Sequence, residues 1–216
     1  MYFLELADIY IKETYGNDNY CRLGMYYLST RQTYKTARQM KTYDYKNPDR
    51  GFALKKEEND YFLMEDFNSC LKLKELGRCP DGYHADASGY SQNGNAVNVE
   101  IKQRNQTLSN FKIQGKTKDG RPYTADTIYI EAHKAGDMLI DYVCECKVPL
   151  YINFLNDGWV IVYNLSKLKH RPKTIAKKIW SDLYQGFELA KREELKLEDA
   201  FIYKKENNKY KLIQRP

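Results

Sequence analysis

The sequence predicts an α/β domain in which a mixed β-sheet is flanked by helices. Apolar residues recur every three or four positions in residues 3–14 and 60–76, which is typical of amphipathic helices. Between Pro80 and Arg104 they instead alternate with polar residues, which is typical of strands. Helical and strand-like segments then alternate along the rest of the chain. This order is typical of α/β and α+β domains with a mixed sheet.

Size, composition and cysteine usage limit the class of protein. The chain has 216 residues, of which 42% are hydrophobic and 30% charged, so it is neither a disordered chain nor a membrane protein. No apolar run is long enough to span a membrane, and acidic residues near the N-terminus argue against a signal peptide. The five cysteines are scattered and odd in number, which favours reduced thiols. We therefore expect a cytoplasmic protein with no membrane partner.

We expect one domain over residues 1–216. Its parts are predicted as a basic helical N-terminal part, a core, and a C-terminal helix and hairpin, at 1–59, about 60–165 and 166–216.

The N-terminal part is predicted to contain two helices. The first covers residues 3–14 and ends near Gly16, and the second covers residues 27–41. No acidic residue occurs between Asp18 and Asp44. Basic side chains recur in this window at helical spacing, at Arg31, Lys35, Arg38 and Lys41. Such a basic stripe is suited to phosphate contacts.

A loop and a third helix precede the first strands. Residues 42–56 interrupt the helical period with Asn47-Pro48 and Gly51, and they are predicted to form a loop. Residues 60–76 are predicted to form a helix that ends at Gly77. Residues 83–90 and 96–104 are predicted strands of a hairpin, since Asn93-Gly94 is a strong turn signal between them.

The remaining elements are predicted, in order, as a strand, a helix, a hairpin, a helix and an edge hairpin, at 126–132, 133–145, 149–165, 174–194 and 201–213. The hairpin over 149–165 turns at Asn156-Asp157-Gly158. The helix over 174–194 is predicted from the spacing of its apolar side chains, at Ile175, Ile179, Leu183, Phe187 and Ala190.

The register of the first hairpin decides which polar side chains meet, because opposed residues share a face and a one-residue slip reverses that face. A two-residue turn at Asn93-Gly94 would place Asp86 opposite Ile101, with its side chain directed away from Glu100. A three-residue turn with Gly94 in the left-handed conformation would place Asp86 opposite Glu100. We expect the three-residue turn, which brings Asp86, Glu100 and Lys102 together.

These three side chains predict a metal site. Two carboxylates on adjacent strands repel each other unless a cation lies between them, and Mg²⁺ commonly takes one or two carboxylates while keeping its waters. We expect Asp86, Glu100 and the main-chain carbonyl of Ile101 to bind Mg²⁺, with Mn²⁺ as a substitute. The ion would lower the pKa of a bound water. Lys102 would orient or deprotonate that water, or stabilise charge on a phosphate.

A strand aspartate followed on the next strand by Glu-x-Lys resembles the active site of the PD-(D/E)XK nuclease superfamily. The matching residues are Asp86 and then Glu100-Ile101-Lys102. The family core, a helix followed by a three-stranded meander, a helix and a further strand, is similar to the elements predicted for residues 60–142. The resemblance implies a restriction endonuclease-like fold and a Mg²⁺-dependent deoxyribonuclease with Asp86, Glu100 and Lys102 as catalytic residues. Some members carry a glutamine two residues past the lysine, but Arg104 occupies that position here.

Three further acids are candidates for a supporting role. Members of the superfamily often carry a glutamate on the preceding helix, and Glu65 matches this position best, with Glu5 as the alternative. Asp81 belongs to a literal Pro-Asp pair and is an alternative to Asp86. Asp86 is preferred, because Asp81 would lie beyond the paired strand and at a position whose side chain is directed to the opposite face from that of Asp86. Glu131 ends a predicted strand on its polar face.

The distribution of basic residues predicts an anionic partner. The net charge is +6, and a second acid-free basic run follows residue 164. The predicted nucleic-acid contacts are Arg31, Lys35, Arg38, Lys41, Arg104, Lys167, Lys169, Arg171, Lys173 and Lys177. DNA is the predicted partner, RNA is an alternative, and a homodimer is left open. The Asn-, Lys- and Tyr-rich composition favours a phage or bacterial origin.

Two other functions are alternatives on the same fold: a non-catalytic nucleic-acid-binding protein, and a phage-type inhibitor whose basic faces meet an acidic protein. His84 and His133 are expected to be structural, because a lone histidine is more often so.

Overall fold

The structure is a computed structural model, and it describes residues 49–80, 83–117, 119–181 and 186–216. Side chains are described over 59–80, 83–117, 119–176 and 190–216. The predicted helices over 3–14 and 27–41 lie outside these residues, as does Asp81. In the described part of the chain, no helix is both long and apolar enough to cross a membrane.

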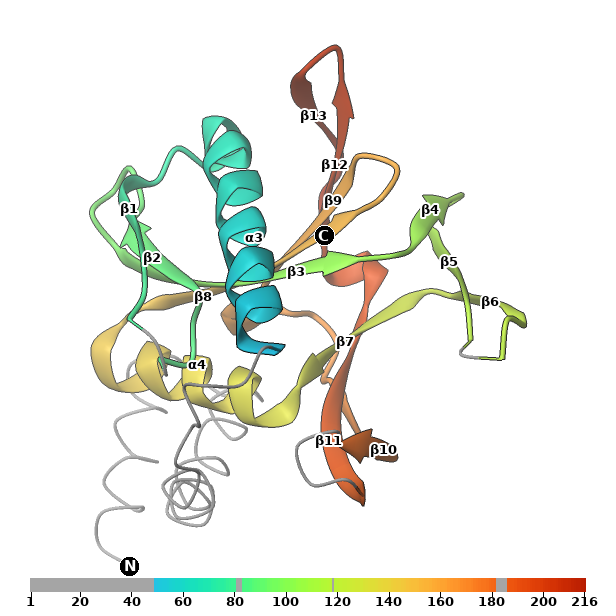
Figure 1. The fold of residues 1–216 in the computed structure, drawn as a ribbon. Helices are drawn as coiled ribbons and strands as arrows, with labels where there is room; N and C mark the ends of the chain where they lie inside the picture. The colour runs from blue at the N-terminus through green and yellow to red at the C-terminus, as the bar shows by residue number, and fades with distance from the viewer. Residues whose placement is uncertain (1–48, 81–82, 118, 182–185) are drawn as a thin grey trace, which may run out of the picture.

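A seven-stranded mixed sheet forms the centre of the molecule (Figure 1). Its strands, in spatial order, are β1 (Lys74–Arg78), β2 (Ala87–Tyr90), β3 (Ala96–Arg104), β8 (Val148–Leu155), β9 (Trp159–Asn164), β12 (Phe201–Glu206) and β13 (Lys209–Gln214). β3 and β8 are parallel, and the other neighbours are antiparallel. The predicted mixed sheet is confirmed. The hairpin over 201–213 is confirmed as β12–β13, with β13 at the sheet edge.

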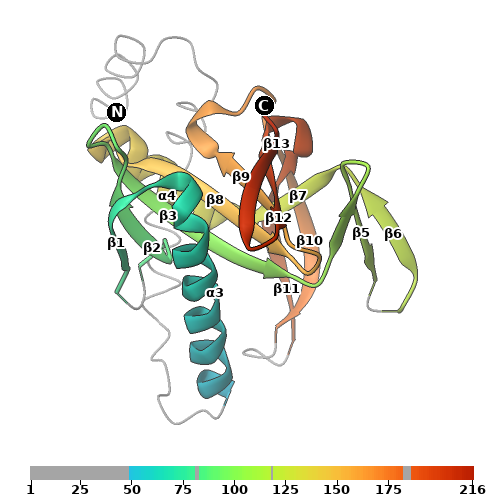
Figure 2. The ribbon, with the colours of Figure 1, turned by 90° about the horizontal axis from the view of Figure 1, so that it is seen from above.

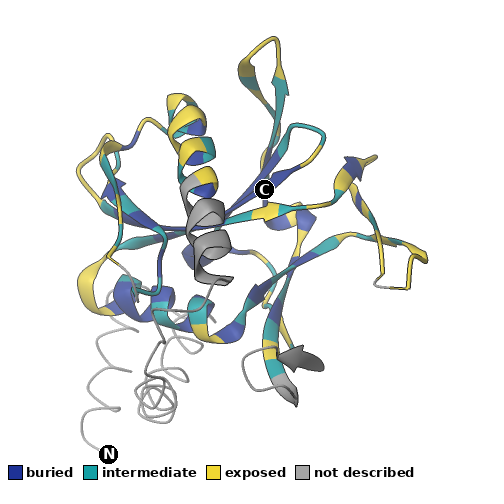
Figure 3. Cartoon of the chain, in the orientation of Figure 1, coloured by how far each residue is buried: buried dark blue, intermediate teal, exposed yellow. Residues whose placement is uncertain are grey.

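Two helices cover opposite faces of this sheet (Figures 1 and 2). Helix α3 (Asp49–Leu71) packs Met64 and Phe67 against one face, in a cluster that includes Val99 and Ile101 of β3. Helix α4 (Ala132–Glu145) packs on the other face through side chains such as Met138. Because strand side chains alternate between faces, Glu100 and Lys102 face α4. Figure 3 shows the buried residues concentrated along the central strands and on α4.

Helix α3 differs from its prediction at both ends. It begins at Asp49, so the predicted loop over 42–56 is wrong from that residue onward. Pro48 directly precedes the helix in sequence, and proline is compatible with a helix start. The helix ends at Leu71, because Lys72 adopts a left-handed φ of 54° and the side chain of Asn68 bonds both backbone groups of Leu73. Residues 74–76 therefore belong to β1, and Gly77 lies within that strand.

The hairpin register is as predicted. Ala87 pairs with Val99 and Ser88 with Asn98, which places Asp86 opposite Glu100. The turn comprises residues 92–94, closed by hydrogen bonds from Ser91 N to Asn95 O (2.8 Å) and from Gly94 N to Ser91 O (3.0 Å). Gly94 has φ +80°, the left-handed conformation that the three-residue turn needs. The predicted strand over 83–90 is shorter than expected, since β2 starts at Ala87.

Two small sheets lie beside the main one. One has the order β10 (Lys173–Ser181), β11 (Gly186–Lys196) and β7 (Thr127–Glu131), and the other has the order β4 (Thr107–Ser109), β5 (Lys112–Lys116) and β6 (Pro122–Ala125). Short 3-10 helices, η1 (Leu165–Lys167) and η2 (Leu197–Asp199), precede β10 and β12.

The predicted helix over 174–194 is wrong, because this segment forms the β10–β11 hairpin. β11 also pairs with β7, and this distant partner outweighs the helical spacing of the apolar residues. Leu195 of β11 is buried in the same cluster as Ile128 of β7. The strand predicted over 126–132, the helix over 133–145 and the hairpin over 149–165 are confirmed as β7, α4 and β8–β9. β4–β6 were not predicted.

We predict that Gly94→Ala lowers the free energy of unfolding by about 1 kcal/mol, because an alanine side chain disfavours the left-handed backbone. A Cβ at Gly94 would meet no atom within 4 Å, so the loss measures backbone strain alone. Gly77→Ala is the matched control, since a Cβ there also has free space and its φ is not positive. Urea unfolding of both variants checks the prediction, and equal losses would contradict it.

Candidate active site

Glu100 is a fully buried carboxylate in the middle of β3, with 0% of the residue exposed. Its Oε1 accepts hydrogen bonds from Lys134 Nζ at 2.5 Å and lies 3.0 Å from Lys102 Nζ. Its Oε2 is buried without a hydrogen-bond partner in the described structure. A buried charged oxygen with no partner is costly, so this atom is the main feature for a ligand to satisfy.

Asp86 lies opposite Glu100, one residue before β2 begins. Its backbone N donates to Val99 O at 2.9 Å, and its Oδ2 accepts a hydrogen bond from Ile101 N at 2.6 Å. The Asp86 carboxylate thus bonds to the backbone of β3 at the point where the backbone pairing of β2 with β3 ends. Because a strand residue directs its N–H and C=O toward the same neighbouring strand, the carbonyl of Ile101 is also directed to the side of Asp86. The predicted ligands therefore occupy adjoining positions.

The pKa values of Glu100 and Lys102 are both raised, but for different reasons. Burial is the largest cause for Glu100, and the nearby Asp86 carboxylate adds to it, against the opposing effects of Lys102 and Lys134. For Lys102, burial opposes the charge, but the carboxylates of Glu100, Glu131 and Asp86 together raise its pKa. Lys102 is therefore an ammonium ion at neutral pH. As an ammonium ion, Lys102 is suited to orienting a water or stabilising charge on a phosphate, and it is not suited to abstracting a proton.

Lys134 is a member of this cluster that the sequence analysis missed. It lies in the first turn of α4, and its side chain is 21% exposed. A cation there opposes the helix dipole, which favours negative charge at a helix N-terminus. The first turn of α4 contains no acidic residue. A lysine at the start of a predicted helix, directly after the strand that ends at Glu131, was the available signal for a buried anionic partner.

The supporting acids have different outcomes. Glu131 is brought to the cluster, because its charge raises the pKa of Lys102, and its Oε2 lies 3.6 Å from His133 Nε2. Glu65 is not brought there. It is exposed on α3, which covers the opposite face of β3, and its charge acts on Tyr61, whose pKa is raised first by burial and then by Glu65.

Arg104 faces the same side as Lys102, but its guanidinium joins three strands. Its Nε donates to Asn153 Oδ1 at 2.6 Å, and its Nη2 donates to Tyr129 O at 2.6 Å and to Tyr151 Oη at 2.5 Å. These bonds connect β3 to β8 and β7. The geometry gives Arg104 a structural role at the edge of the candidate site, in addition to its predicted contact with nucleic acid.

Some of the other predicted nucleic-acid contacts lie outside the described residues, and the rest lie on the surface around η1 and the start of β10. Arg31, Lys35, Arg38 and Lys41 precede residue 49, and the side chain of Lys177 is also outside the described set. Lys167, Lys169, Arg171 and Lys173 are exposed at η1, at the start of β10 and between them.

A second polar cluster lies farther along the α4 face of β3. Asp141 of α4 accepts hydrogen bonds at its Oδ2 from Tyr83 Oη and Asn98 Nδ2, and His84 Nε2 lies at the same distance, 2.7 Å. Burial opposes ionisation of Asp141, but the His84 and Tyr83 hydrogen bonds outweigh it and lower its pKa. A cleft of about 360 Å³ lies beside this cluster and is lined by Tyr83, Asn98 and Lys147 among others.

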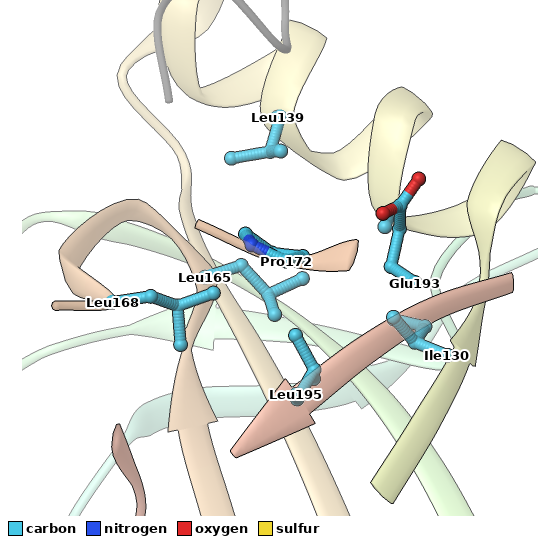
Figure 4. A pocket seen from close by; sticks show the side chains of 8 residues that line it. Ile130, Leu139, Leu165, Leu168, Pro172, Glu193 and Leu195 are labelled. Carbon is cyan, nitrogen blue, oxygen red and sulfur yellow. The ribbon is translucent and has the colours of Figure 1, made fainter. Parts of the chain in front are cut away.

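A small apolar cavity lies between α4 and the β7–β11 pair (Figure 4). Its volume is about 10 Å³, which holds at most one water. Its acidic lining residue, Glu193, accepts hydrogen bonds from Thr174 Oγ1 at 3.0 and 3.1 Å. This cavity is a packing gap of the core and has no room for a substrate.

The residues around Glu100 fit a hard cation. In the residues that the structure describes, no group of three or more His, Cys, Asp or Glu side chains is arranged to hold a metal ion. The predicted set has only two carboxylates and a carbonyl, a number compatible with Mg²⁺, which keeps several waters. The partnerless Oε2 of Glu100 is the observation that fits such an ion.

Comparisons with protein-family models, with characterised proteins and with solved structures found no match to this chain.

We predict that the wild type loses stability relative to Glu100→Gln as the pH rises above 4.5, the ordinary pKa of the carboxyl. The folded-state pKa is raised, so the folded protein binds the proton more tightly than the unfolded chain does. The contribution of the protonated Glu100 carboxyl to stability is complete below its ordinary pKa, and it is lost as the pH rises through the raised pKa of the folded state. Urea unfolding at several values between pH 4 and 8 measures this difference. A wild-type advantage that grows with pH would contradict the raised pKa.

Proposed function

We propose that the protein is a metal-dependent nuclease that hydrolyses phosphodiester bonds in DNA. The single observation that carries the proposal is the buried, partnerless Oε2 of Glu100, on a carboxylate that the hairpin register places opposite Asp86. A divalent cation bound between these two carboxylates would satisfy that oxygen and remove their mutual repulsion. Lys102 on the same strand face supplies the positive charge that a phosphate needs.

The order of the elements supports a restriction endonuclease-like fold for this proposal. α3 is followed by the antiparallel meander β1-β2-β3, then by α4, and then by β8, which is parallel to β3. This order, in which β4–β7 separate β3 from α4, is similar to the helix, three-stranded meander, helix and further strand of the PD-(D/E)XK superfamily. The meander differs from the predicted one at both ends, because β1 is its first strand and the predicted third strand, β7, lies in another sheet.

The roles follow from the positions of the side chains. Asp86, Glu100 and the carbonyl of Ile101 would hold Mg²⁺, with Mn²⁺ as a substitute. The bound ion would lower the pKa of a water and neutralise charge on the phosphate. Lys102, as an ammonium ion, orients the attacking water or stabilises the charge that develops on the phosphate. Lys134 is a positioning residue, because it holds Oε1 of Glu100 and leaves Oε2 available.

A non-catalytic nucleic-acid-binding protein is the second candidate, and one observation favours it. Two lysine ammonium groups already lie against Oε1 of Glu100, so the carboxylate is neutralised without a metal ion. In that case the cluster would be a buried ion-pair network, which requires no reaction. Both candidates predict that the protein binds nucleic acid, but only the nuclease is expected to cleave it.

We predict that the wild type cleaves DNA in the presence of Mg²⁺ or Mn²⁺, and that Glu100→Gln and Lys102→Gln each lower the rate roughly 1,000-fold or more. Linear, circular and branched DNA are compared, with EDTA as a control. Glu206→Gln, an exposed change of the same chemistry on β12, is expected to retain the wild-type rate.

Equal cleavage by the wild type and both site variants would indicate a contaminating nuclease and refute the assignment. Tight DNA binding without cleavage in either metal would favour the non-catalytic candidate.

A further inference from the structure

The strands β4, β5 and β6 and the described residues around them, 105–117 and 119–125, form an arm that projects beyond the main sheet (Figure 1). Both ends of the arm lead to the candidate active site. It begins after β3, which carries Glu100 and Lys102, and it returns through β7, which ends at Glu131. The bond from Arg104 to Tyr129 O joins these two roots.

The inner face of the arm is fixed to the core. Leu108 and Ile113 are buried in the cluster that also contains Ile128. The base is bonded to the turn between β8 and β9, through Leu108 N to Asp157 Oδ2 at 3.1 Å and Asn156 N to Gln106 O at 3.1 Å. The arm is thus held in a defined place relative to the site.

The outer face of the arm is polar and basic. The strand register places Thr107 opposite Gln114 and Gln114 opposite Thr124, while Lys112 lies opposite Ser109 and Lys116 opposite Pro122. All seven residues are exposed, and none of them is acidic. Hydroxyl, amide and lysine side chains are the groups that proteins use to contact phosphates and sugars. This face is suited to a phosphodiester backbone.

The tip of the arm displays an aromatic side chain at a conformational cost. Asn110 and Phe111 form the turn between β4 and β5 with φ of 48° and 55°. Glycine is favoured at the second position of such a turn, and a bulky residue there is an outlier. Yet Phe111 is 43% exposed and adjoins Lys112. Strained residues of this kind occur preferentially at functional positions. An exposed aromatic ring beside a cation is suited to stacking on a base.

We propose that the outer face of this arm binds the phosphate backbone of a DNA strand that extends from the candidate active site, while Phe111 stacks on an unpaired base of that strand. The inference rests on the proposed function for its partner, DNA, and it adds a substrate class: DNA with unpaired bases in the cleaved strand. Base stacking is sequence-tolerant, so the arm recognises strand structure and not sequence.

Phe111→Gly separates a loss of DNA binding from a loss of folding, because this change is expected to weaken binding without lowering stability. Glycine relieves the left-handed backbone, so the melting temperature is expected to stay equal or rise by up to about 2 °C. The affinity for a fluorescent single-stranded oligo-dT of about 20 nucleotides, measured in EDTA, is expected to fall roughly 5- to 150-fold, with a smaller loss for a blunt duplex. Phe62→Ala, which removes a 63% exposed ring from α3, is the control and is expected to bind as the wild type does.

The lysines are tested by the salt dependence of the same binding. The double variant Lys112→Gln/Lys116→Gln is expected to lower the slope of log affinity against log salt by roughly 1.4, since each phosphate contact on a single strand contributes about 0.7. Lys209→Gln/Lys211→Gln, at exposed positions of β13, is expected to keep the wild-type slope.

Wild-type affinity and slope in the arm variants, losses equal to those of the controls, or absence of DNA binding by the wild type would each overturn the inference. Its failure is distinguishable from failure of the proposed function, because cleavage by the wild type and its roughly 1,000-fold loss in Glu100→Gln test the nuclease proposal, whereas binding by the arm variants in EDTA tests the arm. If the arm variants bind DNA normally while Glu100→Gln is inactive and the wild type cleaves, the arm proposal is refuted and the nuclease proposal stands. If the arm variants lose DNA binding but the wild type does not cleave DNA, the nuclease proposal is refuted and the arm proposal stands.

Discussion

The register between β2 and β3 is the constraint on which the candidate site depends, and the left-handed conformation of Gly94 fixes it. The face of every side chain on β2 follows from the number of residues in this one turn. With three residues, Asp86 lies opposite Glu100, and the small side chain of Ala87 packs in the apolar cluster beneath α3. With two, Asp86 would be directed toward the apolar cluster beneath α3, where it would have no cation. The same local choice therefore determines both the packing of the sheet and the presence of a paired-carboxylate site.

Burial of Glu100 links the stability of the domain to its proposed chemistry. A carboxylate with no exposed surface requires compensating charge, and Lys102 and Lys134 supply it from the same strand and from the start of α4. Both ammonium groups lie against one oxygen, which leaves the other without a hydrogen bond in the described structure. The pairing also raises the pKa of Lys102 and so fixes it as a charged group. In the proposed nuclease, this site would hold positive charge next to a phosphate, and the lysines on the outer face of the arm would extend that charge along the bound DNA strand.

The features that the sequence predicted correctly are those that neighbouring residues determine. The turn at Gly94, the alternation along β3 and the edge hairpin over 201–213 each follow from local turn chemistry and period-two patterning. The errors arose where a distant segment decides the structure. β11 pairs with β7, which lies about sixty positions earlier, so the helical spacing around Ile175 was misleading. Helix α3 ends through the side chain of Asn68, a cap without a glycine. Lys134 reaches Glu100 only because α4 packs on that face of the sheet, and the strands of the arm are too short to show alternation.

The most direct test of the central claim, that Asp86 and Glu100 share a divalent cation, is a crystal structure of the protein soaked in Mn²⁺ and recorded at the manganese absorption edge. The account predicts one anomalous peak within about 2.2 Å of a carboxylate oxygen of each residue, with the Oε2 of Glu100 as its ligand. A crystal that shows no peak at saturating Mn²⁺, with Glu100 still bonded only to Lys102 and Lys134, would contradict it.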